Sequence, residues 1–266
     1  MMTDRCQVPG TPRDIRALVR AGKLVRPTCG MAAGFVQTNL VILPRDVAFD
    51  FLVFCQRNPK PCPLLEVLDP GCSEPVGMAP GSDLRTDVGK YRVHRDGSLV
   101  DEPEQVIEYW QWDLVSFLLG CSFTFEAALL DAGIPVRHIE QQTNVPMFIT
   151  SIQTRQAGRL SGPLVVTMRP IPRDQIVRAV QVTSRFPGMH GAPVHIGQPE
   201  AIGIADVNKP DLGDAARIDE GEVPVFWACG VTAQAVAMKS RPPLMITHSP
   251  GYMFVTDKRD ADYAVV

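Results

Sequence analysis

The chain has 266 residues, of which 45% are hydrophobic and 21% charged, as in ordinary globular proteins. Its net charge of -3 leaves no basic excess for phosphate contacts, which argues against a nucleic-acid partner. No apolar run reaches the roughly 20 residues of a membrane-spanning helix, and the first residues lack the apolar segment of a signal peptide. We therefore expect a cytoplasmic protein that does not bind a membrane.

The seven cysteines are an odd number. Without a secretory signal, they are expected to be reduced thiols rather than disulfides. Cys55, Cys62 and Cys72 are seven and ten residues apart, unlike the close cysteine pairs of a zinc ribbon. The sequence therefore predicts no structural metal.

The first part of the chain predicts a helix, a strand, a second helix and a long connection. Thr11-Pro12 begins the first helix with a capping residue and a proline. Residues 40–43 predict a short buried strand, and Pro44 begins a helix with apolar residues at helical spacing. Residues 58–83 are dense in proline and glycine, which indicates a surface connection with a short strand at 64–68.

A β-hairpin is predicted next, with its turn at Asp96-Gly97, followed by a helix over residues 103–119. The remaining elements are predicted from apolar periodicity and from the glycine and proline residues that bound them. In chain order they are a helix at 126–130, strands at 145–152 and 164–168, a helix from Pro172, a strand at 223–228, a helix at 232–239, and strands at 244–247 and 253–256.

Strands that alternate with helices favour an α/β fold. Within it, the helix, strand, strand, helix block of residues 115–188 predicts a smaller two-layer α/β domain. This domain would be inserted into a main α/β domain that is formed by residues 1–114 and 189–266.

Two segments of the chain have matching residue types. Residues 120–127 and 228–235 agree in type at seven of eight positions, each follows an apolar run, and each leads into helical sequence. The simplest interpretation is two copies of one structural element. The alternative is a chance match around two buried core cysteines, Cys121 and Cys229.

A cysteine followed by small residues and a threonine at a helix start gathers free backbone N–H groups and a hydroxyl at one place. Such a place attracts a carboxylate, and the helix dipole would lower the pKa of the thiol. We therefore predict that Cys121 and Cys229 are reactive. Four residues of the two turns are candidates for binding the substrate: Ser122, Thr124, Gly230 and Thr232.

His190 and His195 lie five residues apart in a loop rich in glycine and proline. Imidazole titrates near neutral pH, which makes both of them candidates for general acid and base. Hydrogen bonds to the loop backbone are the alternative explanation. His248, in the turn at 247–251, is a further candidate for the site, but nothing in the spacing requires a metal bound by the three histidines. We predict no bound metal.

Arg169 ends an apolar strand and precedes a proline, so its guanidinium is placed to hold a carboxylate at two points. The alternative is an ordinary surface arginine. The sequence contains neither the glycine-rich fingerprint of dinucleotide binding nor a phosphate-binding loop, and we expect no cofactor. The expected partner is a small-molecule carboxylate, and self-association into a homo-oligomer is left open.

Five segments of the chain, in order, resemble the signature segments of the D-glutamate cyclase family: residues 120–126, 166–170, 190–197, 223–234 and 247–257. The resemblance runs from about Thr11 to Thr256. It implies a larger three-layer α/β/α domain with a smaller two-layer α/β domain, and a lyase that removes water, linked to closing D-glutamate to 5-oxo-D-proline. The chain departs from the pattern with Ala233 for proline, Thr124 and Thr167 for serine, and Phe254 for leucine.

With this resemblance, we expect the two helix starts and Arg169 to bind both carboxylates of glutamate and to stabilise the oxyanion. His190 or His195 would accept the ammonium proton, and Glu126 would deliver a proton to the leaving oxygen. Covalent attack by one of the two cysteine thiols is a variant of this mechanism.

Two functions of other classes fit the same residues. One is a non-catalytic accessory protein that binds an organic acid in the two turns. The other is a metal-dependent lyase or hydrolase with His190, His195 and His248 as its ligands.

Overall fold

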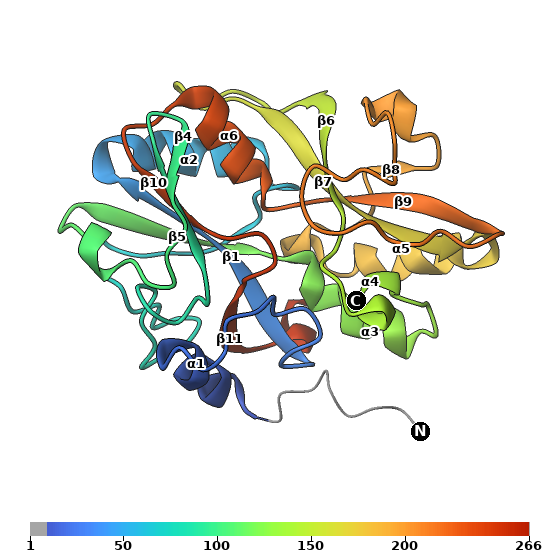
Figure 1. Cartoon of the computed structure of the whole chain (residues 1–266), viewed down its shortest axis with the longest axis horizontal. Helices are drawn as coiled ribbons and strands as arrows, with labels where there is room; N and C mark the ends of the chain where they lie inside the picture. The colour runs from blue at the N-terminus through green and yellow to red at the C-terminus, as the bar shows by residue number, and fades with distance from the viewer. Residues whose placement is uncertain (1–9, 266) are drawn as a thin grey trace.

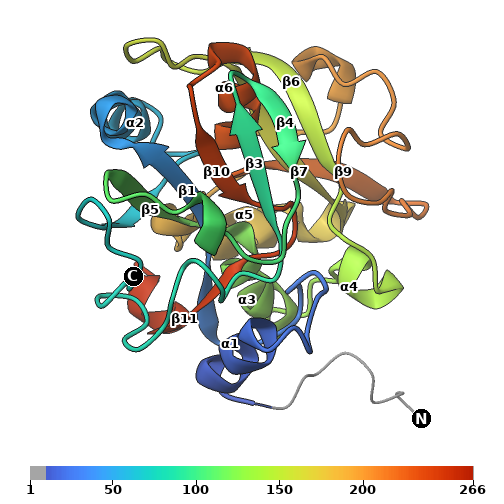
Figure 2. The ribbon, with the colours of Figure 1, turned by 60° about the vertical axis from the view of Figure 1, so that its left-hand side comes forward.

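The computed structural model describes residues 10–265, and their strands form two antiparallel sheets side by side along the long axis (Figure 1). Sheet A contains, in order, β2 (Leu64–Val67), β5 (Leu114–Gly120), β1 (Phe35–Pro44), β10 (Met245–His248), β3 (Tyr91–Arg95) and β4 (Ser98–Asp101), and β11 (Phe254–Arg259) also pairs with β1. Figure 2 turns sheet A toward the viewer. Sheet B contains β6 (Met147–Gln153), β7 (Pro163–Pro172), β9 (Glu222–Ala228) and β8 (His195–Ile196).

The helices are short and connect or cover these strands. The α-helices of the described residues are α1 (Pro12–Arg20), α2 (Arg45–Arg57), α3 (Glu126–Asp131), α4 (Arg137–Gln141), α5 (Ile176–Ser184) and α6 (Thr232–Ser240). The 3-10 helices are η1 (Ile107–Tyr109), η2 (Ser122–Phe125), η3 (Arg173–Gln175), η4 (Pro187–Met189), η5 (Pro199–Ile202) and η6 (Asp260–Tyr263). Within residues 10–265, no helix has the length and apolar character needed to cross a membrane.

Local capping and turn signals in the sequence predict their elements well. Thr11 caps α1: its hydroxyl accepts the backbone N–H of Asp14 at 3.3 Å, and its own backbone N–H donates to the Asp14 carboxylate at 2.9 Å. The predicted hairpin is formed by β3 and β4, and both Asp96 and Gly97 have a positive φ, as a tight hairpin turn requires.

One predicted element is wrong. Residues 103–119 do not form a helix; they contain η1 and then β5, which is buried along its whole length. β5 pairs with β1 on one side and with β2 on the other. A strand that is covered on both faces has a continuous apolar run, and periodicity cannot distinguish such a run from a buried helix.

The mixed α/β class is confirmed, but two strands lie in a different sheet from the one that the sequence suggested. β5 was expected to begin the smaller unit of residues 115–188, and it lies inside sheet A. β9 was expected in the main domain, and it pairs with β7 inside sheet B. The chain therefore passes from sheet A to sheet B after Gly120 and returns after Ala228, at the two matching turns.

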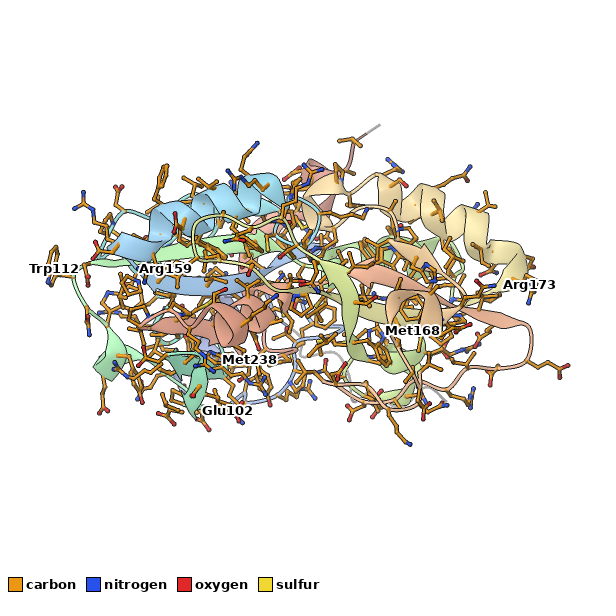
Figure 3. The ribbon with its side chains drawn as sticks, turned by 90° about the horizontal axis from the view of Figure 1, so that it is seen from above. Glu102, Trp112, Arg159, Met168, Arg173 and Met238 are labelled. Carbon is orange, nitrogen blue, oxygen red and sulfur yellow. The ribbon has the colours of Figure 1, made fainter. Side chains whose placement is uncertain are left out.

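Each sheet contains one copy of the same strand pair. β1 and β7 are both ten residues long and end at Pro44 and Pro172, and each proline is followed by Arg-Asp and a helix. Pro44 pairs with Leu114 of β5, and Pro172 pairs with Glu222 of β9. The two helices that follow, α2 and α5, lie on the same side of the molecule, the upper side in Figure 3. The matching turns thus occupy equivalent places in the fold.

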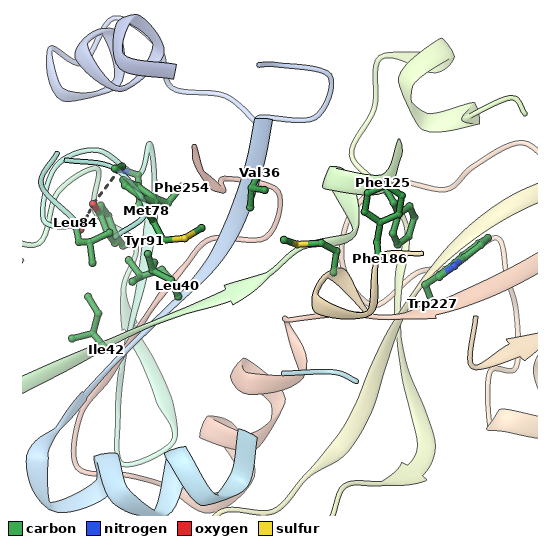
Figure 4. Packing of buried hydrophobic residues seen from close by; sticks show 14 of the residues in the cluster. Val36, Leu40, Ile42, Met78, Leu84, Tyr91, Phe125, Phe186, Trp227 and Phe254 are labelled. Carbon is green, nitrogen blue, oxygen red and sulfur yellow. Dashed lines mark hydrogen bonds between the residues drawn. The ribbon is translucent and has the colours of Figure 1, made fainter. Parts of the chain in front are cut away.

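The largest hydrophobic cluster runs through both sheets (Figure 4). Leu40 and Tyr91 lie at its sheet A end, and Phe125 and Trp227 lie at its sheet B end. All four side chains are fully buried. One core serves both sheets, so the region where sheet A meets sheet B, called the seam below, lies in the protein interior. Polar groups in the seam therefore need partners there.

Candidate functional site

The threonines of the two matching turns hold the neighbouring strands. The Thr124 hydroxyl accepts the backbone N–H of Gln37 in β1 at 3.3 Å. The Thr232 hydroxyl accepts the backbone N–H of Val165 in β7 at 3.1 Å. Gln37 and Val165 are equivalent positions of the repeated strand pair. The observed contacts therefore give both threonines a structural role, where the sequence suggested substrate binding.

Gly230, the second turn's candidate for substrate binding, is required by packing. A Cβ atom at Gly230 would lie 2.1 Å from the side chain of Asn39 in β1. Asn39 also donates from Nδ2 to the carbonyl oxygen of Gly120 at 2.6 Å. The turn that follows sheet B thus fits against a strand of sheet A, and no larger residue could replace the glycine without a shift of Asn39.

Cys121 and Cys229 lie in one buried cluster, so the fold does bring the two turns together. The Cys121 sulfur accepts the backbone N–H of Phe123 at 3.5 Å, the contact expected of a helix start. Burial nevertheless raises the pKa of the Cys229 thiol to about 11, and it also raises the pKa of Cys121. The predicted lowering of the thiol pKa is wrong, because burial disfavours a thiolate more strongly than the helix start favours it.

Arg169 and Glu126 form a buried ion pair in the seam. The Arg169 guanidinium donates to Oε1 of Glu126 from both Nε, at 3.1 Å, and Nη2. Its remaining contacts are to the hydroxyls of Thr167, at 3.0 Å, and Ser122, at 3.1 Å. The predicted pairing of Arg169 with a substrate carboxylate is thus taken by a carboxylate of the protein itself.

Two aromatic rings lie beside this guanidinium. Cζ of Arg169 lies 5.2 Å from the ring centroid of Phe125 and 5.5 Å from that of Trp227, which are both labelled at the right of Figure 4. Arg169 has no exposed surface. Cation–π contacts and charge-assisted hydrogen bonds together offset the cost of burying the charge.

His138, in α4, completes the network. Its Nε2 lies 3.0 Å from Oε1 of Glu126, and both side chains are buried. Burial alone would raise the pKa of Glu126, but His138 and Arg169 beside it lower it by more, so this pKa lies below its usual value. Glu126 is therefore an ionised carboxylate, which contradicts its predicted role as a proton donor.

A pocket of about 360 Å³ leads from the surface to this network. Cys29 and His138 line it, and one ligand atom each of Cys29, Glu126 and His138 lie within 4.8 Å of one another. The pocket therefore reaches the neighbourhood of the Glu126 carboxylate. Its volume is within the range of small-molecule sites.

The pocket carries charges of both signs. Arg26 lines it and makes no ion pair with any residue of 10–265, and Asp214 accepts the backbone N–H of Asn144 at 2.8 Å. Three buried polar atoms in or beside the pocket have no hydrogen-bond partner within the same residues: Thr143 Oγ1, Asn144 Oδ1 and Glu126 Oε2. Each such atom costs about 1–3 kcal/mol unless it is paired, so a polar ligand that paired with them would be bound strongly.

His190 and His248 are buried away from this pocket. Nδ1 of His190 lies 2.7 Å from the carbonyl oxygen of Lys60, and Nδ1 of His248 accepts the backbone N–H of Leu40 at 3.1 Å. Burial lowers the pKa of each imidazole to about 4. Both rings are therefore neutral near pH 7, and neither lines the pocket.

His195 lies on the other face of sheet B. It pairs with Phe226 in β9, which in turn pairs with Met168 in β7, and neighbours along a strand point to opposite faces. Arg169 therefore points to the seam while His195 points away from it. Among the residues that the structure describes, no cluster with metal-ligand spacing contains any of the three predicted histidines, so the metal site built on them is wrong.

Sequence reasoning missed Arg26, Cys29 and His138. Arg26 and Cys29 belong to a connection between α1 and β1 that has no periodic pattern. His138 lies in a helix of five residues, too short to give a clear signal. The available signal was the count of only five histidines in the chain, which made each one a candidate. Only the fold brings these residues to Glu126.

A sequence model described as D-glutamate cyclase matches residues 115–257 of the chain. A relative from Bacillus licheniformis is 62% identical over 255 residues, which are 96% of this chain and 97% of the relative. Relatives from Geobacillus kaustophilus (58% identical, covering 97% and 98%) and Thermoanaerobacter sp. (62%, covering 94% and 94%) are similar. All three carry the provisional name hydro-lyase. A solved nitrogen repressor-like protein from Methanococcus jannaschii aligns over 94% of this chain and 99% of its own, but its TM-score of 0.38 and 11% identity carry no argument.

Proposed function

The chain belongs to the D-glutamate cyclase family and is a lyase, and we propose that it closes D-glutamate to 5-oxo-D-proline with loss of water in the pocket beside His138 and Glu126. The family gives the class of reaction. The proposal of a small amino dicarboxylate as the substrate rests on the charges that line this pocket.

Arg26 and Asp214 suit the two charges of an amino-acid end. The guanidinium of Arg26 would bind the α-carboxylate at two points, since it is not paired with any residue of 10–265. Asp214 and the unpaired Oδ1 of Asn144 would accept hydrogen bonds from the amine. The side-chain carboxylate of the substrate would then extend toward Glu126 and His138.

Ring closure forms a bond between the amine nitrogen and the carbon of the side-chain carboxyl group. One C–O bond of that group breaks, and the two protons that the nitrogen loses leave with the oxygen as water. An ionised carboxylate is a poor electrophile, so the reaction requires a proton or a positive charge at this oxygen. Cys29, Glu126 and His138 are the groups of the chain at this end of the pocket.

One observation carries the proposal: a pocket with both signs of charge has three buried polar atoms in or beside it that lack partners within residues 10–265. Arg169, Ser122 and Thr167 hold the carboxylate of Glu126 in a fixed place beside it. Such a preorganised end favours chemistry on a bound polar group over mere retention of it.

The test is incubation of the purified enzyme with D-glutamate and, separately, with L-glutamate. Chiral chromatography with mass detection should show D-glutamate loss matched by an equal gain of 5-oxo-D-proline. The reverse reaction, from 5-oxo-D-proline, should give D-glutamate at the same equilibrium ratio. The L-isomers serve as controls for uncatalysed closure.

Binding without turnover would contradict the proposal. If D-glutamate or another small acid raises the melting temperature while no product forms in either direction over hours, the pocket belongs to a non-catalytic organic-acid-binding protein. If a different hydroxy or amino acid loses water instead, the pocket is the active site but the substrate proposed here is wrong.

A further inference from the structure

We propose that Cys29, Glu126 and His138 bind one divalent transition-metal ion, of which Zn²⁺ is the type, at the inner end of the pocket. The inference rests on the proposed function, because it assigns the positive charge that ring closure requires. It also departs from the expectation, drawn from the sequence, that the chain binds no metal.

The three side chains are the donors that zinc prefers. They offer a thiol sulfur, a carboxylate oxygen and an imidazole nitrogen, and these atoms all lie within 4.8 Å of one another. Zinc–ligand distances of about 2.0–2.3 Å place two ligands of a tetrahedral site roughly 3.3–3.8 Å apart. The donor atoms therefore need to approach one another by ~1.5 Å at most, which the half-buried Cys29 can supply.

An unpaired oxygen of one buried ligand points to the same conclusion. Oε1 of Glu126 accepts the hydrogen bonds of Arg169, but Oε2 has no partner within residues 10–265. Nε2 of His138 lies 3.0 Å from Oε1 and makes no hydrogen bond with any other residue of 10–265. Both side chains are more than nine-tenths buried. A metal ion would satisfy Oε2, which is costly to leave unpaired, and would bind Nε2 from the same side.

Contacts outside the cluster hold Glu126 and the segment that carries Cys29. Arg169 orients the Glu126 carboxylate, as a hydrogen-bonded neighbour commonly does for a metal ligand. Thr28, next to Cys29, donates to the carbonyl oxygen of Gly251 from its backbone N–H, at 2.8 Å, and from its hydroxyl, at 3.1 Å. The ligands thus come from three separate segments that the fold fixes around one place.

The arrangement is that of a catalytic site rather than a structural one. Three protein ligands leave the fourth tetrahedral position for water or substrate, whereas structural zinc sites use four protein ligands. Cys29 and His138 line the pocket, so this position is open to a ligand there. A carboxylate oxygen of the substrate bound at that position would be neutralised by the ion and opened to attack by the amine.

Cobalt chloride is the probe, because Co²⁺ takes zinc positions and absorbs light. The protein is first treated with a chelator, the chelator is removed, and Co²⁺ is added stepwise. We expect one equivalent to bind, with a thiolate-to-cobalt charge-transfer band and tetrahedral d–d bands that Zn²⁺ abolishes. Cys29→Ser should lose the charge-transfer band, and His138→Gln should bind at least about tenfold more weakly.

Cys72→Ser is the matched control, since Cys72 is an exposed cysteine outside the cluster, and this variant should keep the full spectrum. Less than a tenth of an equivalent of bound Co²⁺ in the folded wild-type protein would overturn the proposal. So would a charge-transfer band that persists in Cys29→Ser. Circular dichroism of each variant shows whether it is folded.

The two proposals fail separately. A folded wild-type protein that binds no Co²⁺ but converts D-glutamate at the full rate would remove the metal proposal and leave the cyclase intact. A protein that binds one Co²⁺ through Cys29 but converts neither D-glutamate nor 5-oxo-D-proline would remove the cyclase and leave the metal site.

Discussion

Arg169 is the residue on which the buried network depends. It has no exposed surface and pairs with Glu126, which is also buried. Removing one partner of a buried pair leaves the other charge without compensation, and this costs more than the pair contributes to stability. The network is therefore a fixed structural part of the site. A variant that removes one of the two charges should also replace the other if the protein is to keep its stability.

We expect Arg169→Met to lower the free energy of unfolding by ~3–5 kcal/mol, because it strands the Glu126 carboxylate in the seam. The double variant Arg169→Met/Glu126→Gln should recover part of this loss. Urea denaturation at pH 7 measures both. Arg85→Met, which breaks the partly exposed pair with Asp83, is the control and should cost about 1 kcal/mol or less. Equal losses in the two single variants would contradict the argument.

Arg26→Ala tests the pocket itself. Loss of a charge-assisted contact of about 1.5–3 kcal/mol should raise KM for D-glutamate about 10- to 100-fold, with a smaller effect on kcat. Arg26→Lys should restore part of the affinity, since it keeps the charge without the two-point geometry. Arg13→Ala removes an exposed arginine of α1 and should leave KM unchanged. An unchanged KM in Arg26→Ala would exclude this arginine from substrate binding.

Part of the candidate site could be predicted from single residues. Ser122, Glu126 and Arg169 were predicted and do meet, but the sequence could not show that Arg169 would pair with Glu126 rather than with a substrate. The sequence could not place His138 beside Glu126. The packing of α4 against the seam brings the two side chains together, and no local sequence pattern reports that packing. Residue type predicts chemistry, whereas the partner depends on the fold.

In each of the two matching turns, one threonine hydroxyl accepts a backbone N–H of a neighbouring strand. We expect Thr124→Val and Thr232→Val each to lower the free energy of unfolding by ~1–3 kcal/mol, because each leaves a buried backbone N–H without its acceptor. Thr38→Val is the control: this hydroxyl is buried without a partner within residues 10–265, so valine should be neutral or stabilising. A similar loss in all three variants would mean that the hydroxyl contacts do not matter.

Most helices and strands were predictable because caps, turns and proline positions are local signals. The sequence of β5 resembles the end of a helix because the strand is covered on both faces and so lacks alternation. The division between sheets could not be predicted either. β5 pairs with β1, and β9 pairs with β7. The partners of each pair are far apart in the sequence, so local sequence patterns do not reveal the pairing.

For the whole molecule, the two sheets should unfold together because one core runs through both. We expect a single urea transition in which the fluorescence of Trp227, in sheet B, and far-ultraviolet circular dichroism coincide. Replacing Trp110 and Trp112 by phenylalanine isolates the Trp227 signal. Two separate midpoints would show that the sheets are independent domains, as the predicted division at residues 115–188 would allow.

Stability should also fall in mild acid through His190 and His248. Their folded pKa of about 4 lies below the ordinary 6.5, so above pH 6.5 both states are neutral and stability is unaffected. Between pH 6.5 and 4 only the unfolded state takes up these protons, and each histidine costs at most ~3 kcal/mol. Below about pH 4 this loss is complete.

The measurement is the free energy of unfolding at steps from pH 7 to 5. His248→Asn should reduce the slope by about one proton. A slope in His248→Asn equal to that of the wild-type protein would rule out a contribution from the buried ring.

The repeated strand pair has a further consequence at the place where its two copies differ. Gln234 stands in the second turn where Glu126 stands in the first, and its amide donates to the His248 carbonyl oxygen at 2.7 Å and accepts from Arg92 at 3.3 Å. The second turn thus carries a neutral amide at the position where the first turn carries the carboxylate of the buried ion pair, so the repeated element has one charged copy and one neutral copy at this position.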